Sequence, residues 1–156
     1  MVPPRPDHIF VAASEASTRV KSRADYVCNG TDDHVDIQAA IDSLPEQSGE
    51  QFSVSGGTVE LSAGSFHLGG SIDCQDKIVN LVGAGMSSTE LTLQDGVDDD
   101  VLVVGTGTQQ GWPSGRISQL TVNGNGKNQE KGSGIRVFAG LRLCLLYTSP
   151  SPRDRG

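Results

Sequence analysis

Residues 30–45 read GTDDHVDIQAAIDSLP, and this stretch carries the strongest amphipathic helix pattern in the chain. Its apolar residues recur at the spacing that lines one face of an α-helix: Ile37, Ala40, Ile41 and Leu44. We predict a helix over residues 33–44 that stops before Pro45, because proline cannot continue the hydrogen-bond ladder. Only short strand-like runs broken by glycine follow. We therefore expect this helix to seal one end of a fold built by repetition.

The start of this helix is acidic. Thr31, Asp32 or Asp33 can accept hydrogen bonds from the exposed N–H groups of the first turn, and Asp33 with Asp36 resembles a capping box. Carboxylates at this end also suit the helix dipole. We therefore interpret the acidic cluster as helix capping rather than as a catalytic site.

The composition favours a thin core with many turns. The chain has 156 residues, of which 35% are hydrophobic, 4% are aromatic and 20 are glycine. The formal charge of −7 argues against a nucleic-acid phosphate backbone as partner, because few basic groups are available to neutralise it. No apolar run is long enough to span a membrane, and the start of the chain has no apolar segment typical of a signal peptide.

The three cysteines, Cys28, Cys74 and Cys144, do not form a metal-binding pair of the Cys-x-x-Cys type. An odd number of cysteines allows at most one disulfide within the chain. We interpret them as isolated thiols.

The first part of the chain contains two further short strands and a second helix. Residues 1–8 are proline-rich and predict a disordered start, followed by strands at 9–12 and 26–28. A small helix is predicted over residues 14–24, capped by Ser14. Residues 47–55 are polar and predict a loop.

From Gly56 onward, runs of about 3–5 apolar-alternating residues are separated by glycine, asparagine and aspartate corners. One of these predicted strands contains Ile117, Leu120 and Val122. Comparable runs recur roughly every 15–22 residues, which favours a solenoid over a hairpin sheet. They begin at Val59, Val79, Val101, Leu120 and Ile135. A β-sandwich is the alternative architecture.

Four segments together resemble the N-terminal entry of the pectate lyase superfamily. They are ADYVCNGTDD at 24–33, IQAAID at 37–42, GGTVELSAGSF at 56–66 and VNLVGAG at 79–85. The resemblance extends over residues 9–140 and implies an all-β solenoid. This would be a right-handed, single-stranded parallel β-helix, truncated, with an N-terminal capping α-helix. His34 departs from the family pattern, which often has a small hydroxyl residue there; we expect little effect on the helix.

The resemblance divides the chain into a start at 1–8 and part of one β-helix domain at 9–143. Residues 144–156 do not continue the coil pattern. They resemble the translation of a sequencing adapter, so we expect them not to be native. A proline-containing native terminus is the alternative.

By resemblance, the complete protein binds polysaccharide, including polymers that contain uronic acid, and if it is an enzyme it cleaves them as a polysaccharide lyase or a glycoside hydrolase. Calcium can assist catalysis in this superfamily, and the active site lies on middle coils outside this fragment. The first alternative is a non-enzymatic phage tailspike, homotrimeric if so, or a cell-surface glycan-binding β-helix; a structural repeat is the third. Each implies an extracellular, cell-surface or virion location.

Several polar clusters have plainer structural explanations. Residues 98–100, three aspartates, lack the alternating spacing of a calcium loop and predict a solvated corner. Residues 83–85 lack the third glycine of a dinucleotide fingerprint and precede a strand. Trp112 can stack on a sugar or anchor a loop, and residues 123–128 predict a side loop. The scattered histidines, His8, His34 and His67, do not suggest one metal site. We assign no catalytic, metal or cofactor-binding residue.

Overall fold

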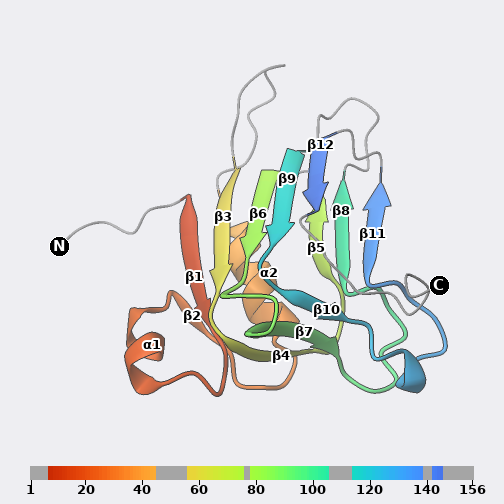
Figure 1. Cartoon of the computed structure of the whole chain (residues 1–156), viewed down its shortest axis with the longest axis horizontal. Helices are drawn as coiled ribbons and strands as arrows, with labels where there is room; N and C mark the ends of the chain where they lie inside the picture. The colour runs from red at the N-terminus through yellow and green to blue at the C-terminus, as the bar shows by residue number, and fades with distance from the viewer. Residues whose placement is uncertain (1–6, 45–55, 76–77, 106–113, 139–141, 146–156) are drawn as a thin grey trace, which may run out of the picture.

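The computed structural model describes residues 7–44, 56–75, 78–105, 114–138 and 142–145 (Figure 1). The early elements are β1 (His8–Ala12), α1 (Thr18–Arg23), β2 (Tyr26–Val27) and α2 (His34–Asp42). Strands and one short 3-10 helix follow: β3 (Gly56–Leu61), β4 (Gly64–Leu68), β5 (Ile72–Gln75), β6 (Ile78–Val82), β7 (Thr89–Leu93), β8 (Leu102–Gly105), β9 (Ser114–Ser118), β10 (Thr121–Asn123), η1 (Gly126–Asn128), β11 (Ile135–Phe138) and β12 (Arg142–Leu145).

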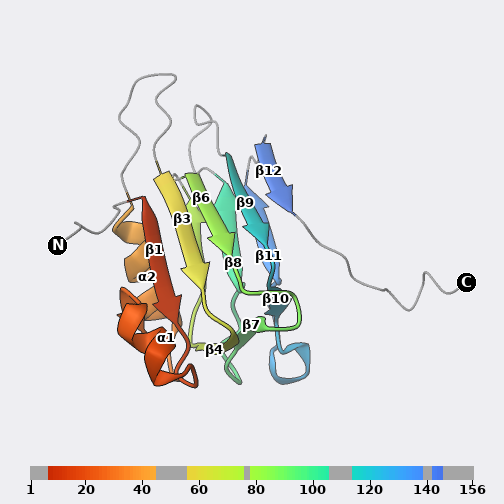
Figure 2. The same ribbon diagram turned by 60° about the vertical axis from the view of Figure 1, so that its left-hand side comes forward.

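The strands form three sheets in which every ladder is parallel. Sheet A has the order β12-β9-β6-β3-β1-β2, sheet B has β10-β7-β4, and sheet C has β11-β8-β5. Each successive triplet of strands gives one strand to each sheet: β3-β4-β5 is coil 1, β6-β7-β8 is coil 2, and β9-β10-β11 is coil 3. Figures 1 and 2 show equivalent strands of successive coils side by side. This arrangement of parallel sheets is compatible with a β-helix-like solenoid.

Columns of apolar side chains run through the coils in register. The columns are Val59–Leu81–Ile117 in sheet A, Phe66–Leu91–Val122 in sheet B, and Ile72–Leu102–Ile135 in sheet C. The first two members of each column are completely buried. The alternation of apolar residues in the sequence predicted inward positions such as Val59, Phe66 and Leu91, and the structure confirms them, whereas the inward position of Leu102 was not predicted.

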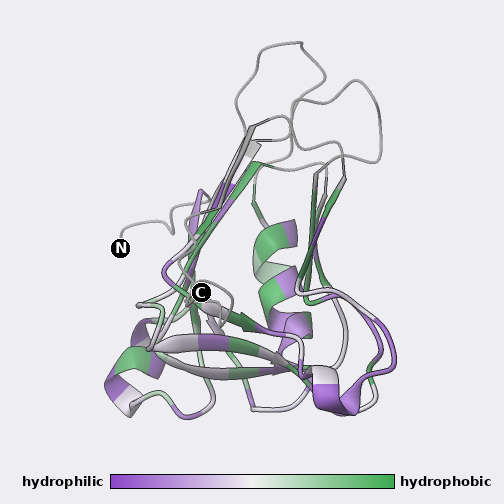
Figure 3. Cartoon of the chain, turned by 45° about the vertical axis from the view of Figure 1, so that its right-hand side comes forward, coloured by the Kyte–Doolittle hydropathy of each residue, from purple (hydrophilic) through white to green (hydrophobic). Residues whose placement is uncertain are grey.

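Helix α2 lies at the N-terminal end of this core. It contacts the first strands of all three sheets, β1 and β3 in sheet A, β4 in sheet B and β5 in sheet C. Figure 3 shows α2 across the space between the three sheets. All four residues of the predicted apolar face are buried, whereas Val35 on the same helix is 59% exposed. The predicted capping position of this helix is confirmed.

The predicted strand through Ile117, Leu120 and Val122 is wrong. The chain turns between sheets at Gln119, which has a left-handed φ of 59°, so Ile117 belongs to β9 and Val122 to β10. The runs listed from the sequence are also spread over all three sheets, with the first two in sheet A, the run at Leu120 in sheet B and the other two in sheet C, so their spacing does not mark one coil. The connections between consecutive strands differ greatly in length, and this unequal spacing hid the three-strand coil.

The first helix is shorter than predicted. It begins at Thr18, and Ser17 is its N-cap, with Oγ accepting a hydrogen bond from the Val20 amide at 3.3 Å. Ser14 lies inside a backbone turn that is closed by a hydrogen bond from the Ala16 amide to the Ala13 carbonyl. Pro45, the predicted loop 47–55 and Trp112 lie outside the described residues.

The apolar columns end in coil 3 within the described residues, and one of their last side chains, that of Val137, is exposed. Val137 is in register with Val104, which in turn is in register with Cys74, and both of these are 5% exposed. Val137 itself is 45% exposed, because no strand of sheet C in the described residues lies over it. Strand β12 pairs with β9 from Arg142 to Leu145. None of the described helices is long and apolar enough to cross a membrane.

Candidate functional site

Asp33 at the start of α2 is completely buried, and its side chain does not cap the helix. One carboxylate oxygen accepts a hydrogen bond from the Gly30 amide and the other accepts from the His67 amide, both at 2.9 Å. The Asp33 amide donates to the His67 carbonyl at 2.8 Å. The capping prediction is therefore wrong for this side chain, because its oxygens bind the preceding turn and strand β4 instead.

The neighbours of Asp33 also make contacts with later coils. The Asp32 amide donates to Gln94 Oε1 at 2.8 Å, and Asp32 adopts a left-handed φ of 52°. The Gly69 amide donates to Nδ1 of His34 at 3.1 Å. A β-carbon at Gly69 would lie only 1.9 Å from an Asp32 carboxylate oxygen. These contacts join the start of α2 to the loop after β4 and give the cluster a structural role.

Cys28, Asp33 and Asp36 place a sulfur and two carboxylate oxygens within 4.8 Å of one another. The sequence did not predict this group, because its spacing matches no metal motif. The Cys28 thiol donates to the Asp33 carbonyl at 3.9 Å, and burial, followed by the nearby carboxylates, raises its pKa. A metal needs the thiolate, which this environment disfavours. We therefore assign no metal to this cluster.

The two buried free thiols, Cys28 and Cys74, give a testable consequence. Burial raises the pKa of Cys74 from 9.0 to about 12 and raises that of Cys28 as well. Because the unfolded thiols ionise near their ordinary pKa, their contribution to stability is complete below pH 9 and falls as the pH rises above it. In a Cys144→Ser background, we expect Ellman's reagent to label both thiols only after urea unfolding. Rapid labelling of the native protein would contradict their burial.

The outer face of sheet B carries polar side chains in register. They are Ser65, His67, Glu90, Thr92, Thr121 and Asn123. Glu90 Oε1 accepts hydrogen bonds from Asn123 Nδ2 and from Thr92 Oγ1, each at 2.8 Å. These bonds, the Asn123 bond first, lower the pKa of Glu90 because they stabilise the carboxylate.

This hydrogen-bonded row predicts the effect of removing Asn123. We expect Asn123→Ala to move the pKa of Glu90 back toward 4.5, because the larger of the two hydrogen-bond contributions is lost. The stabilisation that Asn123 gives through Glu90 is present above the unfolded pKa and is lost as the pH falls through the lower folded pKa. An NMR titration of the Glu90 side chain measures the shift. An unchanged titration curve would contradict the bond.

Asp98 and Asp99 bind backbone groups near the start of sheet C. Asp98 Oδ1 accepts from the Glu130 amide at 2.6 Å, and Asp99 Oδ1 accepts from the Asp100 amide at 2.8 Å. The adjacent loop is fixed further by Asn125, whose Nδ2 donates to the Leu93 carbonyl at 3.1 Å and to Asp95 at 2.7 Å. Residues 94–99 and 123–133 thus form a hydrogen-bonded stack of loops.

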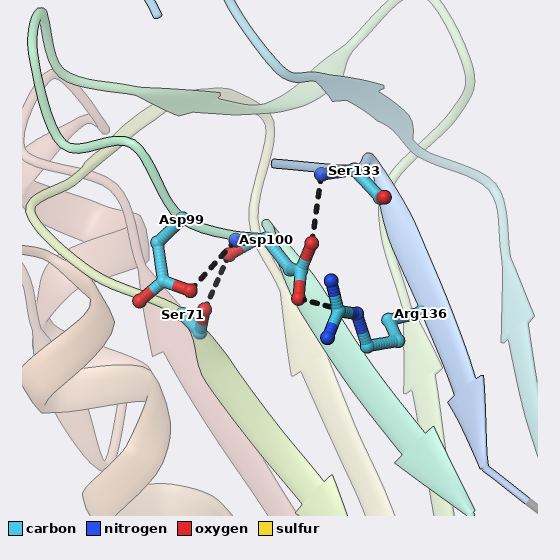
Figure 4. Close-up of polar contacts among 5 residues, drawn as sticks. All are labelled: Ser71, Asp99, Asp100, Ser133 and Arg136. Carbon is cyan, nitrogen blue, oxygen red and sulfur yellow. Dashed lines mark hydrogen bonds and ion pairs between the residues drawn. The ribbon is translucent and has the colours of Figure 1, made fainter. Parts of the chain in front are cut away.

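Asp100 contradicts the prediction that residues 98–100 form a solvated corner, because it is buried. Its Oδ1 accepts from the Ser133 amide at 2.7 Å, and its Oδ2 lies 2.9 Å from Nε of Arg136 (Figure 4). Its carbonyl accepts from Ser71 Oγ at 2.5 Å. Arg136 lies far along the sequence in the next coil, so no local spacing could have indicated this pair. The contact places an exposed guanidinium beside a fixed carboxylate.

The remaining candidates lie on separate elements. His8 pairs with Glu60 at 3.0 Å on sheet A, whereas His34 and His67 lie in α2 and β4. The glycines at 83–85 lead into strand β7, as predicted, and a β-carbon at Gly83 would meet the Gln119 carbonyl at 2.2 Å. Close approach of coils 2 and 3 therefore accounts for that glycine.

The chain is similar in sequence to three enzymes of Azotobacter vinelandii. It is 35% identical over 105 residues to mannuronan C5-epimerase AlgE2 and to mannuronan C5-epimerase AlgE5, which covers 63% of the chain and 10% of each enzyme. It is 34% identical over 107 residues to alginate lyase 7, which covers 64% of the chain and 12% of that enzyme. The chain thus matches only about a tenth of the length of these curated relatives. No family model and no solved structure matches it.

Proposed function

We propose that the chain forms the N-terminal part of a right-handed, single-stranded parallel β-helix of the pectate lyase superfamily. In this proposal the complete protein binds and modifies a polysaccharide that contains uronic acids. The observation that carries it is the 35% identity to enzymes named for mannuronan and the 34% identity to one named for alginate. Three parallel sheets built from successive three-strand coils support the fold part of the proposal.

The relatives are named for two reactions, C5 epimerisation and lyase cleavage, and both reactions begin with loss of the same proton. Epimerisation at C5 and lyase cleavage of a uronate chain both remove the proton beside the carboxyl group. A base must accept this proton, and positive charge or hydrogen-bond donors must stabilise the charge that develops. We place the base on coils beyond coil 3, where a further coil would also cover the exposed side chain of Val137. Calcium and an extracellular or cell-surface location belong to the same proposal.

The similarity to an epimerase and a lyase favours uronate chemistry over hydrolysis by paired carboxylates. A tailspike or another binding-only protein would retain the polymer without changing it. The products therefore distinguish the enzyme from these alternatives.

The test uses the product of the complete reading frame with polymannuronate, with and without added calcium. We expect either new unsaturated chain ends, detected by ultraviolet absorbance, or new guluronate units, detected by NMR. Carboxyl-reduced polymannuronate is the control substrate and should remain unchanged. Binding without either product would contradict the enzymatic function, and equal binding to the carboxyl-reduced polymer would contradict uronate selectivity.

A further inference from the structure

We propose that Arg136 is a carboxylate-binding residue of a uronate subsite on the outer face of sheet C, and that Asp100 positions its guanidinium group. The choice of a uronate as ligand rests on the proposed function. The location of the subsite rests on the contacts of these two residues.

The register of sheet C places Arg136 on the outside of the coils. Arg136 lies beside Val103 of β8, which lies beside Asp73 of β5. Its neighbours in the sequence, Ile135 and Val137, belong to the inward columns, and alternate residues of a strand point to opposite faces. The Arg136 side chain is 53% exposed, so a ligand on this face can reach it.

Asp100 contacts the guanidinium group of Arg136 through its carboxylate and restricts the position of that group. Its buried carboxylate is fixed by the Ser133 amide through one oxygen and contacts Nε of Arg136 through the other (Figure 4). Its backbone is fixed in turn by Ser71 and by the Asp99 carboxylate. These contacts come from all three coils. They restrict a flexible side chain before any ligand arrives, which lowers the entropy cost of binding.

The outward residues Asp73, Val103 and Arg136 of sheet C suit an acidic sugar in one orientation. The planar fork of arginine matches a carboxylate, and such charge-assisted hydrogen bonds are stronger than neutral ones. A chain with a formal charge of −7 repels a polyanion, so binding depends on a cation placed at the point of contact. Val103 offers an apolar surface next to Arg136, and Asp73 lies two strands away, about 10 Å at the usual strand spacing. A uronate carboxylate on this face would therefore lie toward β11 and away from β5.

The experiment measures binding of a mannuronate hexasaccharide to the full 156-residue chain by calorimetry. We expect Arg136→Gln to weaken binding by about tenfold or more, the usual effect of losing a hydrogen bond to a charged group. Arg116→Gln is the matched control: it removes the same charge from the same coil, on β9 of sheet A, and should change the affinity by less than about twofold. The carboxyl-reduced hexasaccharide should bind equally weakly to all variants.

A second measurement tests the same site in the unsubstituted protein. On titration with the hexasaccharide, the Nε–Hε NMR signal of Arg136, assigned by its loss in Arg136→Lys, should shift more than that of Arg116. Asp100→Asn should move this signal toward the position of an unrestrained arginine and weaken binding several-fold in samples that circular dichroism shows to be folded. A purely structural Asp100 would lower the melting temperature without changing the affinity of the folded fraction.

Three results would overturn the inference. They are equal binding by Arg136→Gln and Arg116→Gln, an Arg136 signal that does not respond to the hexasaccharide, and absence of binding by the 156-residue chain. Each of them leaves the proposed function standing if the product of the complete reading frame still modifies polymannuronate. Loss of that activity, in contrast, would remove the reason for choosing a uronate.

Discussion

Replacing Ile41 with aspartate is expected to unfold the chain. Ile41 is 1% exposed on the face of α2 that covers the first strands of the three sheets. Loss of the buried side chain alone costs about 2–5 kcal/mol, and a buried unpaired carboxylate adds several more. The total is comparable with the whole stability of a typical domain, about 5–15 kcal/mol. Urea unfolding followed by circular dichroism measures the loss.

Val35→Asp is the matched control because it adds the same charge to the same helix. Val35 is 59% exposed, so we expect its substitution to change the free energy of unfolding by no more than about 0.5 kcal/mol. If Ile41→Asp instead unfolded at the same urea concentration as the control, α2 could not be the element that seals the core.

Asp33→Ser is expected to destabilise the chain by about 2–4 kcal/mol, because two part-buried amide groups lose the buried carboxylate that accepts their hydrogen bonds. Serine is a good N-cap, so a residue whose role was capping would tolerate this substitution. It cannot replace the two carboxylate oxygens that accept from Gly30 and His67. The free energy of unfolding from urea titration therefore separates the observed role of Asp33 from the predicted one.

Asp36→Ser is the control for this experiment. Asp36 lies in the first turn of α2 and is half-buried, so its substitution also removes a negative charge near the helix N-terminus. We expect a loss of about 1 kcal/mol or less. Equal losses from both substitutions would show that charge near the helix dipole matters more than the bonds of Asp33 to the turn and to β4.

The spacing of apolar residues along the sequence predicted which side chains of the helix and strands are buried. The spacing of Ile37 and Ile41 identified the buried face of α2, and strand alternation identified inward residues such as Phe66. The resemblance supplied the expectation of parallel coils, and the parallel sheets are compatible with it.

Features that depend on contacts between coils could not be predicted in this way. Loops of unequal length hid which strands are equivalent, and a turn at Gln119 separates two strands that appear continuous in the sequence. The position of Asp33 before α2 suggested a helix cap. Its bond to His67 joins residues far apart in the sequence, so local pattern could not predict it. Asp100 looked solvated because its partner, Arg136, comes from the next coil. Hydrophobic periodicity carries no information about such polar pairs.

The most direct test of the functional account is the fate of the C5 proton of polymannuronate. The product of the complete reading frame would be incubated with the polymer in D2O and followed by proton NMR. The account predicts that the C5 signal decreases with time, because an epimerase replaces this proton with deuterium and a lyase removes it. A C5 signal that stays constant while the protein binds the polymer would contradict the account and indicate a protein that only binds glycans.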